Sequence, residues 1–122
     1  MGRKILIIDD EDDIREVASL SLETVAGWEV IKASSGAQGV ARAAEHRPDA
    51  ILLDVMMPGM DGPATFRELR KNPATAAIPV IILSGDSGQV TVNELLAAGA
   101  ADFLAKPFDI HRLLAVIERY LP

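Results

Sequence analysis

The chain has 122 residues, of which 49% are hydrophobic and 4% aromatic, and its formal net charge is −6. This length is close to that of one domain, so we expect a single domain over residues 1–122 with an aliphatic core. The sequence contains no cysteine, which excludes disulfide bonds and thiolate metal sites and fits a cytoplasmic protein. No apolar run approaches the roughly 20 residues of a membrane helix, and the N-terminal pattern is not that of a secretory signal.

Acidic residues are concentrated in residues 9–13, which read DDEDD. The basic residues are scattered and form no stripe with aromatic residues between them. A nucleic-acid-binding surface needs such a positive stripe. We therefore expect no direct contact with nucleic acid.

Short aliphatic runs alternate with longer helical patterns along the chain. The runs predict strands at residues 5–8, 28–33, 50–53, 78–83 and 101–105. The helical patterns predict helices at residues 13–25, 34–46, 61–72, 87–98 and 109–121. Glu16 follows Asp13 at the spacing of a capping box, which predicts that Asp13 caps the first helix. Asp12 at the same start is also suited to capping, and so are the side chains at three later starts, Ser34 and Ser35, Asp61, and Asp109.

Five βα units in succession indicate an α/β fold. The first, third and fourth strands are continuous apolar runs, which is typical of central strands covered on both faces. The second strand is mixed and suits an edge. With right-handed crossovers, these features predict a doubly wound, five-stranded parallel sheet of order 2-1-3-4-5, a flavodoxin-like architecture.

Polar side chains stand where four of the predicted strands end. Asp9 and Asp10 follow the first strand and Asp54 ends the third, while Ser84 and Lys106 follow the fourth and fifth. Ligands of open parallel sheets bind beyond the carboxyl ends of the strands. We therefore expect these side chains to converge on one site.

The acids of this set suit a hard divalent cation. Mg²⁺ takes oxygen ligands and is usually held by one or two carboxylates. Asp10 and Asp54 are the candidate ligands, with Asp9 nearby or acting through water and the backbone carbonyl of Met56 completing the protein's share. Three acids so close repel each other, so without a cation at least one pKa is expected to rise.

Asp54 is also a candidate nucleophile, because an aspartate carboxylate can attack phosphorus and form an aspartyl phosphate. Phosphoryl transfer requires that charge on the phosphoryl oxygens be neutralised. Lys106 offers an ammonium for one oxygen, Ser84 a hydroxyl for another, and Mg²⁺ suits the third. Each residue also has an ordinary structural role open to it, as a helix cap, a turn former or a solvated loop residue. Their joint convergence favours the chemical interpretation.

The same residues carry a resemblance to a known family. They are the Asp9–Asp10 pair, Asp54 within residues 52–62, the Ser84–Gly85 pair and the segment Lys106–Pro107–Phe108. In order and spacing the chain resembles the receiver domain of two-component response regulators, of the single-domain type found among chemotaxis regulators. The resemblance extends from residue 4 to the final helix.

The resemblance implies roles for individual residues. Asp54 would accept a phosphoryl group from a phosphohistidine on a sensor histidine kinase or histidine phosphotransfer protein. Mg²⁺ would be bound by Asp10, Asp54 and the Met56 carbonyl, with Asp9 assisting. Lys106 would contact the phosphoryl group, and its peptide bond to Pro107 would be cis.

The resemblance also implies a response to phosphorylation. Ser84 would move toward the phosphoryl group and Phe103 would turn inward. This movement would remodel the face formed by the fourth helix, the fifth strand and the fifth helix, to which an unknown downstream protein would bind. Val116 and Tyr120 fall off the core stripe of the last helix and are candidates for partner contact.

Two other functions remain open at this point. Phosphohydrolases of the haloacid dehalogenase type carry a second aspartate two residues after the nucleophile, where this chain has Met56. That difference favours a regulatory domain over an enzyme with turnover. An interaction module that never meets phosphate is the other alternative. We expect a monomer or weak dimer without an output domain in this chain, either as a stand-alone regulator or as a receiver excised from a longer protein.

Overall fold

The computed structural model describes residues 3–57, 61–85 and 89–121. Five parallel strands form one sheet in the order β2-β1-β3-β4-β5, which confirms the predicted topology and places β2 at an edge. The strands are β1 (Lys4–Ile8), β2 (Glu29–Ala33), β3 (Ala50–Asp54), β4 (Val80–Ser84) and β5 (Asp102–Ala105). The second, fourth and fifth begin one or two residues later than predicted.

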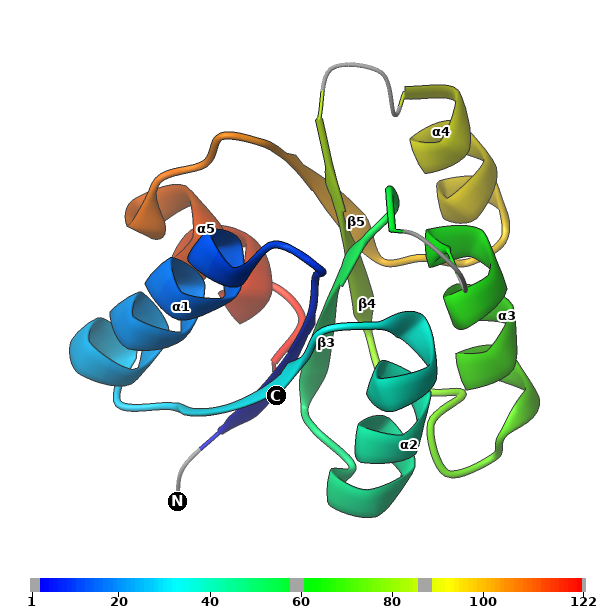
Figure 1. Ribbon diagram of the computed structural model, residues 1–122, viewed down its shortest axis with the longest axis horizontal. Coiled ribbons are helices and arrows are strands. Elements are labelled where there is room, and N and C mark those ends of the chain that lie inside the picture. The colour runs from blue at the N-terminus through cyan, green and yellow to red at the C-terminus, as the bar shows by residue number, and fades with distance from the viewer. Residues whose placement is uncertain (1–2, 58–60, 86–88, 122) are drawn as a thin grey trace.

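Helices cover both faces of the sheet (Figure 1). On one face lie α1 (Asp12–Ser21) with its π-helical continuation η1 (Leu22–Ala26), and α5 (Ile110–Glu118). On the other lie α2 (Gly36–His46), α3 (Gly62–Lys71) and α4 (Gln89–Ala97). The predicted start of the fourth helix, Ser87, lies outside the described residues. Among the described residues, no helix is long and apolar enough to cross a membrane.

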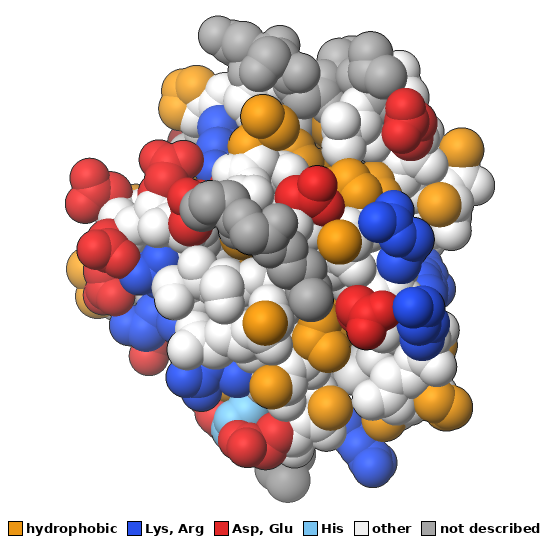
Figure 2. Space-filling view, turned by 45° about the vertical axis from the view of Figure 1, so that its right-hand side comes forward, with side chains coloured by type: hydrophobic (Ala, Val, Ile, Leu, Met, Phe, Trp, Pro, Cys, Tyr) orange, Lys and Arg blue, Asp and Glu red, His pale blue; other side chains and the backbone are white. Residues whose placement is uncertain are grey.

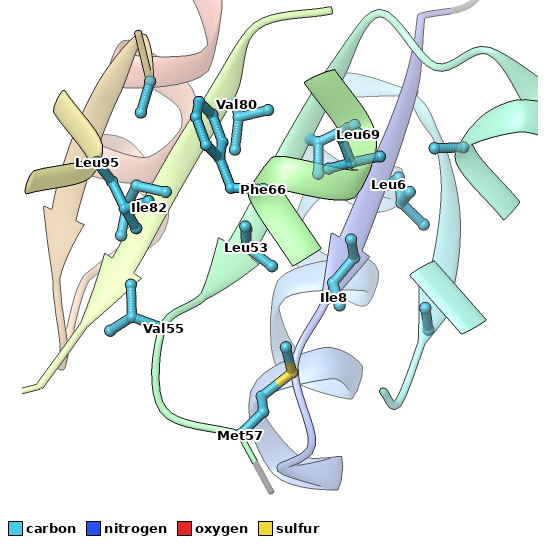
Figure 3. Packing of buried hydrophobic residues seen from close by; sticks show 14 of the residues in the cluster. Leu6, Ile8, Leu53, Val55, Met57, Phe66, Leu69, Val80, Ile82 and Leu95 are labelled. Carbon is cyan, nitrogen blue, oxygen red and sulfur yellow. The ribbon is translucent and has the colours of Figure 1, made fainter. Parts of the chain in front are cut away.

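The central strands are buried on both faces and supply two hydrophobic clusters. Alternate residues of one strand point to opposite sides of a sheet. Ile5 and Ile7 of β1 accordingly join the cluster beneath α1 and α5, and Leu6 and Ile8 join the other. In Figure 3, Phe66 of α3 reaches toward side chains of the sheet. The continuous apolar runs thus position the ends of three adjacent strands rigidly.

Three helix starts are capped by the side chains that the sequence indicates. Ser35, Asp61 and Asp109 accept hydrogen bonds from backbone N–H groups in the first turns of α2, α3 and α5. The first helix is different. It begins at Asp12, and the residue in the N-cap position, Glu11, makes no capping hydrogen bond with its side chain.

The predicted capping box of Asp13 and Glu16 is therefore wrong. The Asp9 carboxylate accepts the Glu11 N–H at 2.9 Å, which turns the chain into the helix ahead of Asp13. Asp13 lies in the first turn, where acids suit the helix dipole. Glu16 instead pairs with Lys32 of β2 at 3.0 Å.

The interpretation of Val116 and Tyr120 as exposed partner contacts is also wrong. Val116 is buried in the core cluster beneath α5, three residues after the buried Leu113. Tyr120 packs against the same cluster, and its hydroxyl donates to Asp102 Oδ2 at 2.9 Å. The apolar stripe of a surface helix can span more than 100° of the helix surface, and on α5 it is wide enough to include Val116.

Candidate functional site

The carboxyl ends of β1, β3 and β4 and the segment after β5 bring the predicted site residues together. Asp9 follows β1 and is fully buried, and Asp54 ends β3 and is 2% exposed. Lys106 Nζ lies 2.9 Å from Asp9 Oδ2 and 3.4 Å from Asp54 Oδ1. Residues 45 and more positions apart in sequence therefore form one ion-paired group, as strand order 2-1-3-4-5 requires.

Ser84 lies beside this group at the end of β4. It is 4% exposed, and its backbone carbonyl accepts the Lys106 N–H at 2.7 Å. The peptide bond between Lys106 and Pro107 is cis. Phe103, three residues before Lys106 on β5, is 38% exposed.

Four carboxylates gather at this edge of the sheet. Asp9, Asp10, Glu11 and Asp54 each place one oxygen within 4.8 Å of the others, with Asp10 and Glu11 exposed. Acidic side chains also gather on the left of the space-filling view (Figure 2), the side on which α1 lies in Figure 1. Clustered carboxylate oxygens are the donors that Mg²⁺ and Ca²⁺ prefer.

The two carboxylate oxygens of Asp54 differ in their hydrogen bonding. Oδ1 accepts the Met56 N–H at 3.2 Å and lies near Lys106, whereas buried Oδ2 accepts no hydrogen bond from the described residues. An orphaned buried carboxylate oxygen is costly. The residues present therefore fit a cation, which would satisfy this oxygen and reduce the repulsion among the acids.

The electrostatics of Asp54 follow from its surroundings. Burial is the main cause that raises the pKa of Asp54 to about 6, and the negative charge of Asp9 raises it further. Lys106 and the hydrogen bond from Met56 oppose the rise. The expected upward shift of at least one acid is thus confirmed, and a neighbouring cation would lower this pKa.

Burial lowers the pKa of Lys106, but its contacts with Asp9, Asp54 and Glu11 outweigh burial and raise the pKa above its usual value. Its ammonium is therefore charged at neutral pH and stands against three carboxylates. A phosphoryl group on Asp54 would lie beside a fixed positive charge.

Two residues of the site were missed by sequence reasoning. Glu11 Oε1 lies 3.4 Å from Lys106 Nζ, although the sequence shows it only as one acid among five in a row. Gly62 begins α3, and a Cβ atom there would lie 2.5 Å from the Val55 Cα and 3.0 Å from the Asp54 carbonyl oxygen. The clustering of glycines after Asp54 was a signal of such a close approach. Residues 58–60 of the same loop lie outside the described residues.

Fold and site together define a class of signalling domain. Residues 5–118 match the family model of the response regulator receiver domain, and the chain belongs to this family. The family acts in two-component systems, where receiver domains interact with histidine kinases and downstream targets. Phosphorylation and Mg²⁺ are general features of it.

Individual relatives agree with this assignment. The chain is 40% identical over 119 residues to the DNA-binding dual master transcriptional regulator RpaA of a Synechocystis strain, an alignment that covers 97% of this chain and 48% of RpaA. The chain spans about half the length of several such curated relatives.

Two solved structures are similar over nearly the whole chain. Chemotaxis protein CheY4 of Vibrio cholerae has a TM-score of 0.91 and 33% identity, covering 99% of this chain and 100% of CheY4. The receiver domain of the Pseudomonas aeruginosa sensor histidine kinase PA1611 has a TM-score of 0.88 and 32% identity, covering 98% of each chain. That receiver has a magnesium ion coordinated in its active-site cleft.

Proposed function

We propose that this chain is a phosphorylation-dependent switch in which Asp54 accepts the phosphoryl group. The observation that carries the proposal is the convergence of buried Asp54, at the end of β3, with Asp9 and Lys106, which follow β1 and β5. Ion pairs that serve stability alone are rarely buried with an unpartnered carboxylate oxygen, because that arrangement is costly.

The reaction is the transfer of a phosphoryl group to a carboxylate. An oxygen of Asp54 forms the new bond to phosphorus as the bond from phosphorus to the imidazole nitrogen of the donor phosphohistidine breaks. The electron pair of that bond stays on the imidazole. Lys106 and the hydroxyl of Ser84 stabilise the charge on the phosphoryl oxygens. The donor is a sensor histidine kinase or a histidine phosphotransfer protein.

Asp10, Asp54 and the Met56 carbonyl would hold Mg²⁺, with Asp9 assisting, and the bound cation would neutralise charge on the transferring group. In the described structure, support for this set is the carboxylate cluster and the free oxygen of Asp54. Glu11 belongs to the same cluster. The absence of a second aspartate at position 56 speaks against hydrolytic turnover, so the chain is a regulatory domain and not a phosphatase.

The output of the switch is a change of the face formed by α4, β5 and α5. Phe103 of β5 is partly exposed and lines a groove of about 250 Å³ together with residues of α5. Movement of Ser84 toward the phosphoryl group and of Phe103 inward would shift the population between two packings of this face. A downstream protein in the cytoplasm would read the difference.

Incubation with Mg²⁺ and acetyl phosphate, followed by intact mass measurement, tests the proposal. We expect one added phosphoryl group on the wild type, none without Mg²⁺ and none on Asp54→Asn. Asp61→Asn is the matched control: it removes an exposed acid seven residues along, and asparagine still caps α3. Release of phosphate over many turnovers would point to a hydrolase, and a folded protein that takes no phosphoryl group would point to an interaction module.

A further inference from the structure

Glu11 contacts Lys106 from the solvent side of the site. Its carboxylate oxygen Oε1 lies 3.4 Å from Lys106 Nζ, and its side chain is 59% exposed against 14% for Lys106. The lysine ammonium has three N–H donors. They face three carboxylates, those of Asp9, Asp54 and Glu11.

The position of Glu11 does not serve the helix that it precedes. Glu11 is in the N-cap position of α1, yet its side chain makes no capping hydrogen bond. The starts of α2, α3 and α5 are capped by shorter side chains, Ser35, Asp61 and Asp109. Glutamate is too long for this task and aspartate is well suited to it. The extra methylene of Glu11 instead carries its carboxylate to Lys106.

A phosphoryl group on Asp54 would compete with Glu11 for the same ammonium. Lys106 is close to Asp9 at 2.9 Å and to the phosphoacceptor itself, so Glu11 is the partner that can be replaced without exposing a buried charge. The Glu11 carboxylate is mostly exposed, and water can solvate it once it is released.

We propose that Glu11 is a positioning residue that holds Lys106 before phosphorylation and yields it to the phosphoryl group, so that it slows phosphorylation of Asp54. This role rests on the proposed function, because it regulates the same site. It acts through the lysine and also adds one negative charge in the path of an anionic donor. The contact with Lys106 and the added negative charge both lower the rate of phosphorylation.

Three variants separate the contact from the charge. Glu11→Gln removes the ion pair and the charge. Glu11→Asp keeps the charge but shortens the side chain to the length that caps α1, which draws it away from Lys106. Asp13→Asn is the matched control, because it removes an exposed acid two residues further along that has no role in the described ion pairs of Lys106.

The rate of phosphorylation by acetyl phosphate is measured by intact mass over a range of Mg²⁺ concentrations. We expect Glu11→Gln to react about two- to fivefold faster than the wild type, because the variant loses both the exposed ion pair, which alone accounts for about twofold, and one negative charge in the path of the donor. Glu11→Asp should also be faster, Asp13→Asn should change less than Glu11→Gln, and the increase should persist when Mg²⁺ is saturating.

The proposal is overturned if Glu11→Asp matches the wild type while Glu11→Gln matches Asp13→Asn, because charge alone would then explain the rates. Slower reaction of Glu11→Gln with weaker Mg²⁺ dependence would also overturn it and would place Glu11 in the set that holds the cation. A wild type that takes no phosphoryl group would refute the proposed function, and with it the role of Glu11. The wild-type result thus separates the two failures.

Discussion

The bodies of the central strands and their carboxyl ends follow opposite rules. In the segments 5–8, 50–53 and 80–83 of β1, β3 and β4 the side chains are aliphatic and fully or nearly fully buried, and their packing stabilises the fold. At the ends of these strands the buried residues are Asp9, Asp54 and Ser84. Burial stabilises an isoleucine or leucine, but it destabilises an aspartate that must stay charged.

This difference shows that position along a strand decides the role of a buried residue: residues within the strand stabilise the fold, and residues at its carboxyl end form the site. Leu52 and Asp54 are two residues apart on β3, point to the same face and are both nearly inaccessible to solvent. One belongs to the cluster beneath α1 and α5, and the other has an orphaned oxygen and a raised pKa. Replacing each should therefore change the free energy of unfolding in opposite directions.

The largest effect is expected for Leu52→Ala. The substitution removes a fully buried side chain and leaves a cavity in the sheet, so the free energy of unfolding should fall by about 2–5 kcal/mol. Urea denaturation followed by circular dichroism measures this change. Val17→Ala is the control: Val17 is 65% exposed on α1, and its removal should change stability by less than about 0.5 kcal/mol. Equal losses in both variants would contradict the assignment of Leu52 to the core.

Asp54→Asn should instead stabilise the metal-free protein at neutral pH. Burial and Asp9 raise the pKa of Asp54 from 3.8 to about 6, so ionisation is harder in the folded protein than in the unfolded chain. The wild type therefore loses stability as pH rises from about 4 to about 6, and the loss then stays constant. Above this range the asparagine variant should be more stable by about 1–3 kcal/mol, and near pH 3 the two should converge.

Urea denaturation at several pH values between 3 and 8, with a chelator present, measures the difference. Asp61→Asn is again the matched control, because it removes an exposed acid that lies outside the carboxylate cluster. An Asp54→Asn variant that is less stable than the wild type at pH 8 would show that the ion pair with Lys106 outweighs the burial of charge.

Addition of Mg²⁺ should reduce the difference in stability between the wild type and Asp54→Asn. A cation that binds the folded protein stabilises it by mass action, by about 2–3 kcal/mol at one hundred times its dissociation constant. In the wild type the melting temperature should rise with Mg²⁺, and stability should depend less on pH between 4 and 6, because the cation lowers the pKa of Asp54. In Asp54→Asn the rise should be smaller. Equal rises in the two proteins would place the cation away from Asp54.

The sheet order and the convergence of Asp9, Asp54, Ser84 and Lys106 could be predicted because they follow from strand periodicity and from the fixed hand of βα crossovers. Each of these residues stands at or directly after the end of a strand, so its place in the fold follows from the place of that strand in the sheet. The resemblance to the receiver family rests on the same positions. Features that depend only on the local sequence pattern and on strand order are therefore found in the structure as predicted.

Other features lie outside the patterns used for prediction. The Asp9 carboxylate accepts the N–H two residues on and moves the start of α1 ahead of Asp13, a local turn that competes with the capping box. The exposure of Val116 was misjudged because the width of the buried stripe on α5 depends on what the sheet presents to it. Glu11 meets Lys106 across 95 residues of chain, and only the assembled sheet edge brings these two side chains together.

The smallest expected effects compare two helix starts, one within the fold and one at the site. Ser35→Ala removes the hydroxyl that accepts the Gln38 N–H, so α2 should lose about 1 kcal/mol of stability. Glu11→Ala removes no capping bond, and its exposed contact with Lys106 contributes less than about 0.5 kcal/mol. Thermal unfolding of both variants beside the wild type measures the difference. A Glu11→Ala loss as large as that of Ser35→Ala would mean that Glu11 serves the stability of α1 after all. A near-zero loss would leave its carboxylate with a role only at the site.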